Sequence, residues 1–168
     1  MKYSIVKPEI YTGDVILWKG TGIVSQTIRL FSGGYSHASL VLRLDEFEGL
    51  KDRRFVLEAV HSGVGLNLLS NAMHDHGEAY LYQMKDEYTD KRNAIACWAL
   101  GRVGTPYDFG GVFRNLFGYI SADVKRLFCS EFVYLAYKEA GILNEQTAPR
   151  PGDITRWGCF KNPVRIDE

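Results

Sequence analysis

Hydrophobic positions in the first half of the chain form short runs of the kind that is typical of β-strands. Four such segments are mostly apolar, and turn-forming glycines or charged residues separate them. The second and third are joined by the charged stretch DEFEGLKDR, which is the pattern of two neighbouring antiparallel strands. We therefore predict strands over residues 14–18, 36–44, 54–60 and 78–84.

Apolar residues in the second half recur with the spacing of amphipathic helices instead. We predict one helix over residues 89–104, with Thr89 or Asp90 as its N-cap and Cys97 buried and inert within it. A second helix is predicted over residues 127–142, closed by a glycine at the C-cap position. Its expected buried positions are Phe132, Val133, Ala136, Tyr137 and Ala140. Strands followed by helices indicate an α+β fold.

Composition and charge narrow the possibilities further. The length of 168 residues is that of a single domain, which we expect to span residues 1–168. Twenty basic residues balance twenty acidic ones, so no net field attracts nucleic acid or an anionic membrane. We expect no signal peptide, no transmembrane segment and a cytoplasmic location. The three cysteines match neither a disulfide framework nor a metal-binding motif.

Cys129 is the leading candidate for chemistry, because it falls in the first turn of the predicted helix 127–142. The unpaired N–H groups and the dipole of a helix N-terminus favour a thiolate there. A nearby imidazole would lower the thiol pKa further and shuttle protons. A single cysteine in an apolar segment is more often a packing residue, so a catalytic role requires a partner.

Four histidines are available as that partner, and His37 is the best placed. It opens a predicted strand directly after SGGYS, where the imidazole can project from the sheet end into a cleft. His61 lies in the glycine-rich HSGVG, as a loop candidate. His74 and His76 lie in MHDHGE, which is typical of an exposed polar loop. A metal pair there would need further ligands, so we expect no metal and no cofactor.

Glu58 is an acidic residue inside the apolar segment FVLEAV, where a buried carboxylate is costly unless it is paired. If strands 36–44 and 54–60 form an antiparallel hairpin, residues whose numbers sum to about 95 face one another. That register sets Glu58 beside His37, where the carboxylate would hold the orientation of the imidazole. The alternative is a strand residue that faces solvent.

Four short motifs together resemble the NlpC-type papain-like amidases. GRVGTPYDFGG and LFCSEFVYLAYKEAGI are similar to the cysteine segment of that family, and TGDVILWKG and SHASLVL are similar to its glycine–aspartate and histidine strands. Here the histidine precedes the cysteine, so the resemblance is to the circularly permuted, YiiX-like branch, over roughly residues 11–143. It implies a papain-like α+β fold, with an antiparallel sheet or small barrel packed against helices and a cysteine at a helix N-terminus.

The resemblance also implies a thiol-dependent hydrolase of amide bonds, a cysteine peptidase or amidase that works through an acyl-enzyme. Cys129 would be the nucleophile, His37 the general base and then acid, and Glu58 the polar third residue. Tyr107, in the turn before the cysteine, would help the Cys129 backbone N–H to stabilise an oxyanion. The alternative for Tyr107 is a core aromatic.

Departures from the family pattern leave the substrate open. The common cysteine motif has a glycine where this chain has Glu131, which suggests a differently shaped pocket. Residues 112–126 form an aromatic insertion, which is either a lid or a packed connecting helix. A peptide such as a peptidoglycan fragment is the first substrate expected; a lipid, in deacylation or acyl transfer, is the alternative. A non-catalytic binding domain of the same fold is the alternative from another class.

Overall fold

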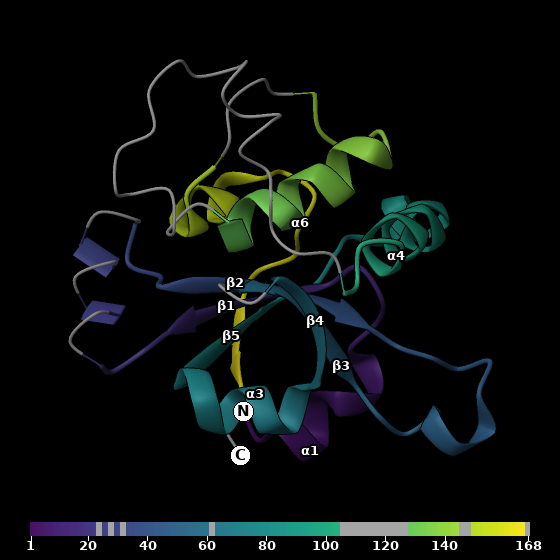
Figure 1. The fold of residues 1–168 in the computed structure, drawn as a ribbon, viewed down its shortest axis with the longest axis horizontal. Helices are drawn as coiled ribbons and strands as arrows, with labels where there is room; N and C mark the ends of the chain where they lie inside the picture. The colour runs from purple at the N-terminus through teal and green to yellow at the C-terminus, as the bar shows by residue number, and fades with distance from the viewer. Residues whose placement is uncertain are drawn as a thin grey trace.

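The protein is built around a six-stranded antiparallel sheet (Figure 1). The computed structural model describes residues 1–22, 25–26, 29–30, 33–60, 63–104, 128–144 and 149–166. In the sheet the strands follow the order β4-β3-β2-β1-β5-β6, and every neighbouring pair is antiparallel. The strands are β1 (Val15–Lys19), β2 (His37–Leu42), β3 (Phe55–Val60), β4 (Gly63–Leu68), β5 (Glu78–Tyr82) and β6 (Val164–Ile166).

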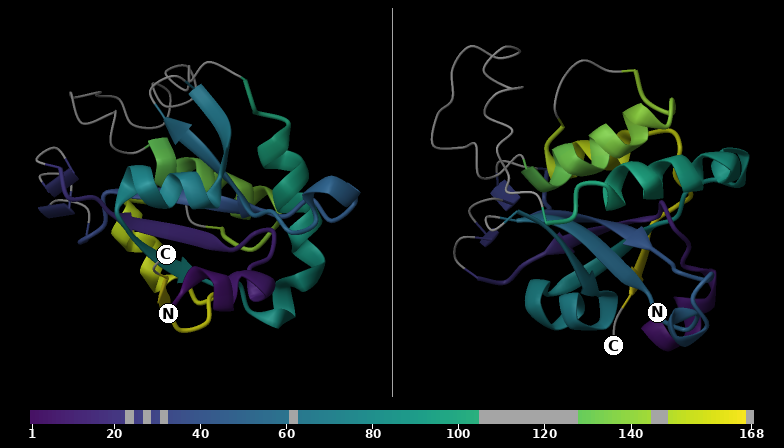
Figure 2. Two further views of the ribbon diagram at one scale, coloured as in Figure 1. Left: turned by 90° about the horizontal axis from the view of Figure 1, so that it is seen from below. Right: turned by 45° about the vertical axis from the view of Figure 1, so that its right-hand side comes forward.

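Helices cover both faces of this sheet. In Figure 1, α4 and α6 lie above it and α1 and α3 lie below it, and the turned view on the right of Figure 2 keeps the same layers. The α-helices are α1 (Tyr3–Val6), α3 (Leu69–His76), α4 (Arg92–Leu100) and α6 (Phe128–Glu139). Short 3-10 helices are η1 (Lys7–Glu9), η2 (Glu48–Leu50), η3 (Asp86–Lys91) and η5 (Pro151–Arg156).

Alternation along the central strand sends side chains into two separate cores. Val15 and Leu17 of β1 belong to the cluster that includes the buried face of α6, whereas Ile16 and Trp18 belong to the cluster that includes α3. Because both faces of β1 are buried, its sequence is an almost unbroken apolar run rather than an alternating one.

Helix α6 agrees closely with the sequence prediction. All five of its predicted core positions are buried, and it begins at Phe128. Gly141 has a φ of 74°, and the N–H of Ile142 donates to the carbonyl of Tyr137 at 3.0 Å, which is the glycine-closed helix end that the sequence indicated. The four predicted strands are also present, each within two residues of the expected bounds.

Other local predictions are wrong. The segment that contains His74 and His76 is not a loop, because it forms the end of α3. Helix α4 begins only at Arg92, after a 3-10 turn, and no side chain caps it. Cys97 is exposed rather than buried, since α4 turns only Ile95 and Ala99 fully into the core. Strand β4 and helix α3 were not predicted at all.

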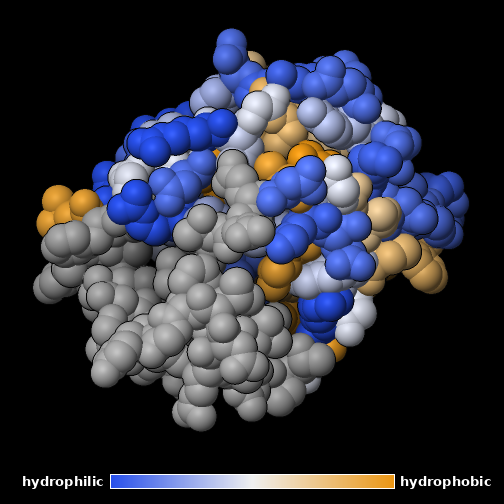
Figure 3. Space-filling view, turned by 90° about the horizontal axis from the view of Figure 1, so that it is seen from above, coloured by the Kyte–Doolittle hydropathy of each residue, from blue (hydrophilic) through white to orange (hydrophobic). Residues whose placement is uncertain are grey.

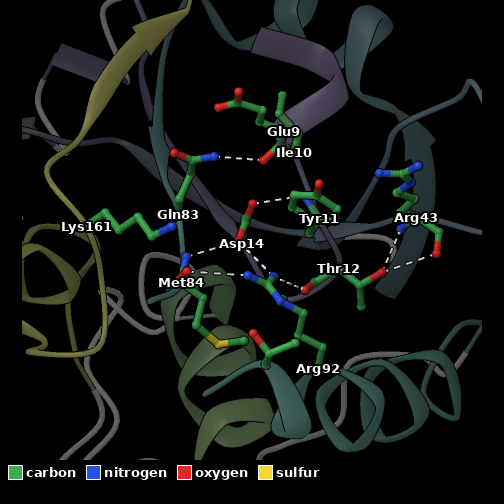
Figure 4. Close-up of polar contacts among 12 residues, drawn as sticks. Glu9, Ile10, Tyr11, Thr12, Asp14, Arg43, Gln83, Met84, Arg92 and Lys161 are labelled. Atoms are coloured by element: carbon green, nitrogen blue, oxygen red, sulfur yellow. Dashed lines mark hydrogen bonds and ion pairs between the residues drawn. The ribbon is translucent and has the colours of Figure 1, made fainter. Parts of the chain in front are cut away.

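Asp14 ties three parts of the fold together at the entrance to β1 (Figure 4). Its fully buried carboxylate accepts hydrogen bonds from the backbone N–H of Tyr11 at 2.9 Å and of Met84 at 3.0 Å. The Arg92 guanidinium at the start of α4 completes the set at 2.9 Å. Every oxygen of this buried carboxylate therefore has a partner, as a structural role requires.

Candidate active site

Three elements meet at one end of the sheet and bring the predicted functional side chains together. His37 opens β2, Glu58 lies in β3 and Cys129 is the second residue of α6. The side chains of His37 and Glu58 are 13% and 8% exposed, and Cys129 is buried. The site is thus assembled from two segments that are distant in the chain.

The strand register explains how Glu58 reaches His37. Leu40 pairs with Leu57 across β2 and β3, so the register is two positions away from the predicted one and Glu58 lies opposite Ser39. A shift of two positions keeps every side chain on its face of the sheet. Nε2 of His37 consequently lies 3.3 Å from Oε2 of Glu58 on the diagonal.

The imidazole of His37 also forms a hydrogen bond with the thiol of Cys129. Because Nε2 faces Glu58, Nδ1 is the ring nitrogen that is available to the sulfur. The backbone N–H groups of Ala38 and Ser130 hydrogen-bond the same sulfur. As the first-turn N–H groups of a helix have no partner within that helix, the Ser130 N–H can serve the thiolate.

These contacts favour a thiolate–imidazolium pair. Burial raises the pKa of the Cys129 thiol, but the charge and hydrogen bond of His37 and the two backbone donors outweigh it and lower the pKa. Burial likewise lowers the pKa of His37, whereas the Cys129 thiolate and the hydrogen bonds to Cys129 and Glu58 raise it above its ordinary value. A thiol with a lowered pKa beside an imidazole is an arrangement that can perform nucleophilic chemistry.

His76 is a further member of the site that the sequence analysis did not select. Its Nε2 lies 2.8 Å from the same Oε2 of Glu58, and its ring stacks on that of His37 with centroids 4.6 Å apart. The ring of Trp18 also contacts that of His76, with centroids 5.1 Å apart and the planes tilted by 48°, and the Trp18 indole N–H donates to Ser39 Oγ at 2.7 Å. Helical spacing in the sequence could have indicated the position of His76, because residues 69, 72, 73 and 76 fall on one face of α3.

Gly77 fixes the end of α3 and thereby the position of His76. It has a φ of 90°, and a Cβ there would come within 3.0 Å of the Lys19 carbonyl oxygen. Only glycine adopts this conformation without strain so close to the backbone of β1. The helix can therefore end directly beside the strand that carries Trp18.

Glu58 accepts hydrogen bonds from two imidazoles through a single oxygen. Burial raises its pKa, but the hydrogen bonds and charges of His37 and His76 lower it to about 2. Among the described residues, no donor reaches the other oxygen, Oε1, which is buried. The donor atoms of His37, Glu58 and His76 lie within 4.8 Å of one another, and two imidazoles with one carboxylate are a donor set that suits Zn²⁺. These are the residues that could hold a metal.

Glu131 lies two positions after Cys129 and is 2% exposed. Burial raises its pKa to about 8, so the side chain is mostly neutral near pH 7. Ser130, between them, donates through Oγ to the carbonyl of Pro149 at 2.6 Å. This buried hydrogen bond ties the first turn of α6 to the segment that follows the helix.

A cleft of about 370 Å³ opens beside His37 and leads to solvent. Its described lining consists mainly of glycines and small or polar side chains, with Val60 as the aliphatic exception. Ser36, His74, Asp75 and His76 are among the polar groups. Figure 3 shows the face above α6, where hydrophilic side chains cover most of the coloured surface.

Tyr107, His61 and the insertion 112–126 lie outside the described residues. Their predicted roles therefore stay predictions. Among the described helices, none has the length and apolar character needed to cross a membrane.

Comparison with known proteins places the chain in a family. Residues 9–149 match the family described as permuted papain-like amidase enzymes of the YaeF/YiiX, C92 type, and the chain belongs to that family. The solved structure of the metalloprotein YiiX from Escherichia coli O157:H7 is similar in fold, with a TM-score of 0.56 and 24% identity. The match covers 77% of this chain and 66% of that protein. No curated protein sequence matches significantly.

The predicted fold class and family resemblance are therefore confirmed. The protein has a permuted papain-like α+β fold, with an antiparallel sheet between helices and a cysteine in the first turn of α6.

Proposed function

We propose that the protein is a thiol-dependent amide hydrolase that works through an acyl-enzyme on Cys129. The observation that carries this proposal is the chain of contacts from the Cys129 thiol to His37 and from His37 to Glu58. It is the nucleophile, base and orienting group that covalent hydrolysis requires. The membership in a family of amidases supports the same reaction class.

In this mechanism the Cys129 sulfur attacks the carbonyl carbon of the substrate amide. The carbon–nitrogen bond breaks as His37 gives its proton to the leaving amine, which leaves a thioester on the sulfur. His37 then takes a proton from water, and the resulting attack releases the acid and restores the thiol. Glu58 keeps the imidazole oriented and stabilises its positive charge throughout.

The cleft beside His37 favours a polar peptide-like substrate over a lipid. Its described lining offers hydroxyl, imidazole and carboxylate groups and little aliphatic surface. An acyl chain would bury apolar area poorly there, whereas a short peptide could satisfy its hydrogen bonds. Peptidoglycan-type peptides are therefore the first substrates to test, with phospholipids as the comparison.

The test measures turnover of both substrate panels by the wild type and by Cys129→Ala. Cys97→Ala is the matched control, because this cysteine is exposed on α4 and outside the site. We expect turnover of an amide that is lost in Cys129→Ala and kept in Cys97→Ala. Intact mass spectrometry of the wild type, quenched with acid during turnover, should show an acyl adduct on Cys129.

Each alternative has its own outcome. Turnover of phospholipids alone would show that the protein cleaves lipid esters or transfers acyl groups, and not that it hydrolyses amides. Equal amide turnover by wild type and Cys129→Ala would refute the thiol mechanism. A folded protein without turnover of either panel, and with equally slow labelling of its cysteines, would indicate a binding domain.

A further inference from the structure

The contacts of Glu58 are unusual for a carboxylate that only orients a histidine. Two imidazole Nε2 atoms, at 3.3 Å and 2.8 Å, approach the same oxygen, while the buried Oε1 has no donor among the described residues. Two hydrogen-bond donors would more favourably divide between the two oxygens, because a buried acceptor without a hydrogen bond destabilises the fold. Instead, three possible metal-ligand atoms lie close together, namely Nε2 of His37, Nε2 of His76 and Oε2 of Glu58.

The two stacked rings add an electrostatic argument. His37 and His76 have centroids 4.6 Å apart, so two imidazolium ions there would repel each other in a largely buried setting. Two neutral imidazoles can instead direct their lone pairs at a shared cation, whose charge Glu58 partly balances. This arrangement gives Oε2 of Glu58 and both Nε2 atoms a common partner.

The chemistry of the donors selects the kind of cation. Two nitrogens and one carboxylate oxygen suit Zn²⁺ and similar transition-metal ions, whereas Mg²⁺ and Ca²⁺ prefer oxygen ligands. The cleft that both His37 and His76 line provides an entry path and room for a water molecule as a fourth ligand.

We propose that His37, Glu58 and His76 form a binding site for a divalent transition-metal ion such as Zn²⁺, and that ion binding switches off the thiol chemistry. An imidazole that binds the ion through Nε2 carries its proton on Nδ1, which faces the Cys129 sulfur. It can no longer accept the proton of the thiol. The second half of the proposal rests on the proposed function, whereas the binding itself does not.

Binding is tested in a chelator-treated Cys97→Ser/Cys129→Ser double variant, which has neither the exposed thiol nor the nucleophile. Isothermal titration with ZnCl₂ should give a single ion per chain. Adding His76→Gln should weaken the affinity by at least about 100-fold, because a ligand is lost. Asn71→Ala is the matched control, exposed on the same helix α3 and outside the cleft lining, and should bind as the parent does. Circular dichroism of each variant checks folding.

Equal affinity of the His76→Gln variant and its parent would overturn the site, as would a parent that binds no ion. Replacement with CoCl₂ gives a second readout, because the visible spectrum of bound Co²⁺ reports its ligands and should change in Glu58→Gln. For a glutamine variant that fails to fold, His76→Asn takes its place with the same expected loss.

The inhibitory half is tested on Cys97→Ser alone, by iodoacetamide labelling of Cys129. ZnCl₂ at saturation should slow this labelling, and the added His76→Gln substitution should remove the effect. Slowing that persists in His76→Gln would place the ion on the thiol itself and overturn the proposed switch. Because the titration uses a protein without the nucleophile, a failure of the amidase proposal would leave the binding result intact.

Discussion

The ring of His76 stacks on the ring of His37 with 4.6 Å between centroids and 30° between planes. The stack, together with the shared Glu58 oxygen, holds His37 from two directions. An imidazole held in this way loses little further conformational entropy when it acts on a bound molecule. His37 is thus positioned by residues from β3 and α3, as well as by its own strand.

The pH dependence of thiol labelling follows from the lowered pKa of Cys129. A lowered pKa keeps more of the thiol ionised as the pH falls, so labelling of Cys129 by iodoacetamide should fall less between about pH 8 and about pH 6 than labelling of the denatured wild type. In His37→Ala the rate should fall steeply over the same range. Mass spectrometry of labelled peptides measures this, with the denatured wild type as reference.

Cys159 provides the contrast within the same molecule. It is buried, and burial raises its pKa to about 11, so it should label far more slowly than Cys129 at every pH in that range. A Cys129 rate that tracks that of the denatured protein would contradict the activated-thiol assignment.

Glu58→Gln should lower the turnover of an amide substrate by about 100-fold or more, mainly in kcat. The neutral amide cannot stabilise the imidazolium that forms as the thiol loses its proton. Steady-state kinetics separate this from a binding defect, in which KM would rise at constant kcat. Glu78→Gln, on β5 and outside the site, is the control and should keep wild-type kinetics.

Glu131 should make stability fall as the pH rises. Its pKa is about 8 when folded and 4.5 in the reference state, so the folded protein holds the extra proton between these values. Stability from this group is complete below about pH 4.5 and is lost as the pH rises through about 8. Urea unfolding should show Glu131→Gln gaining up to a few kcal/mol over wild type between about pH 5 and pH 9.

The matched control for this experiment is Glu139→Gln, exposed on the same helix. Its substitution removes no buried carboxyl group, so it should not reproduce the gain of Glu131→Gln between about pH 5 and pH 9. A constant difference for Glu131→Gln over this range would show that Glu131 is ionised in the folded protein.

Arg92→Ala should destabilise the fold by about 3–5 kcal/mol, because it leaves the buried Asp14 carboxylate without its counter-ion. Asp14→Asn combined with Arg92→Ala should cost less than the two single changes together, since the uncompensated charge is then gone. Urea unfolding measures all three. Lys161→Ala removes an ion pair at the surface and should change stability little. A loss of stability as large as that of Arg92→Ala would contradict a special contribution of the buried Asp14–Arg92 pair.

Periodic patterns in the sequence were enough to predict the parts of the site that regular elements carry. The apolar spacing of residues 127–142 placed Cys129 in the first turn of α6, and the acidic residue within FVLEAV marked Glu58 as a buried carboxylate. The predicted register was wrong by two positions, but an even shift leaves His37 and Glu58 on one face. The predicted juxtaposition of His37 and Glu58 was therefore correct despite the wrong register, because side chains alternate between faces every two residues.

His76 could not be predicted in the same way, since its role depends on contacts between distant elements. Helical spacing could have placed it on the buried face of α3, but the polar residues around it are typical of a loop. The approach of α3 to Glu58 depends on the packing of Trp18 and on the backbone at Gly77, neither of which has a sequence pattern that points to a histidine. The exposure of Cys97 likewise depends on which side of α4 meets the core.

The order of the site residues along the chain has a consequence for synthesis. A ribosome makes the imidazole and the carboxylate first and the sulfur much later, so a nascent chain that has folded only β1 to β5 contains no nucleophile. The sulfur gains its hydrogen bonds from His37 and Ala38 only after the start of α6 has been made and has docked on the sheet. The thiol can therefore meet His37 and Glu58 only late in synthesis, when β1 to β5 have already been made.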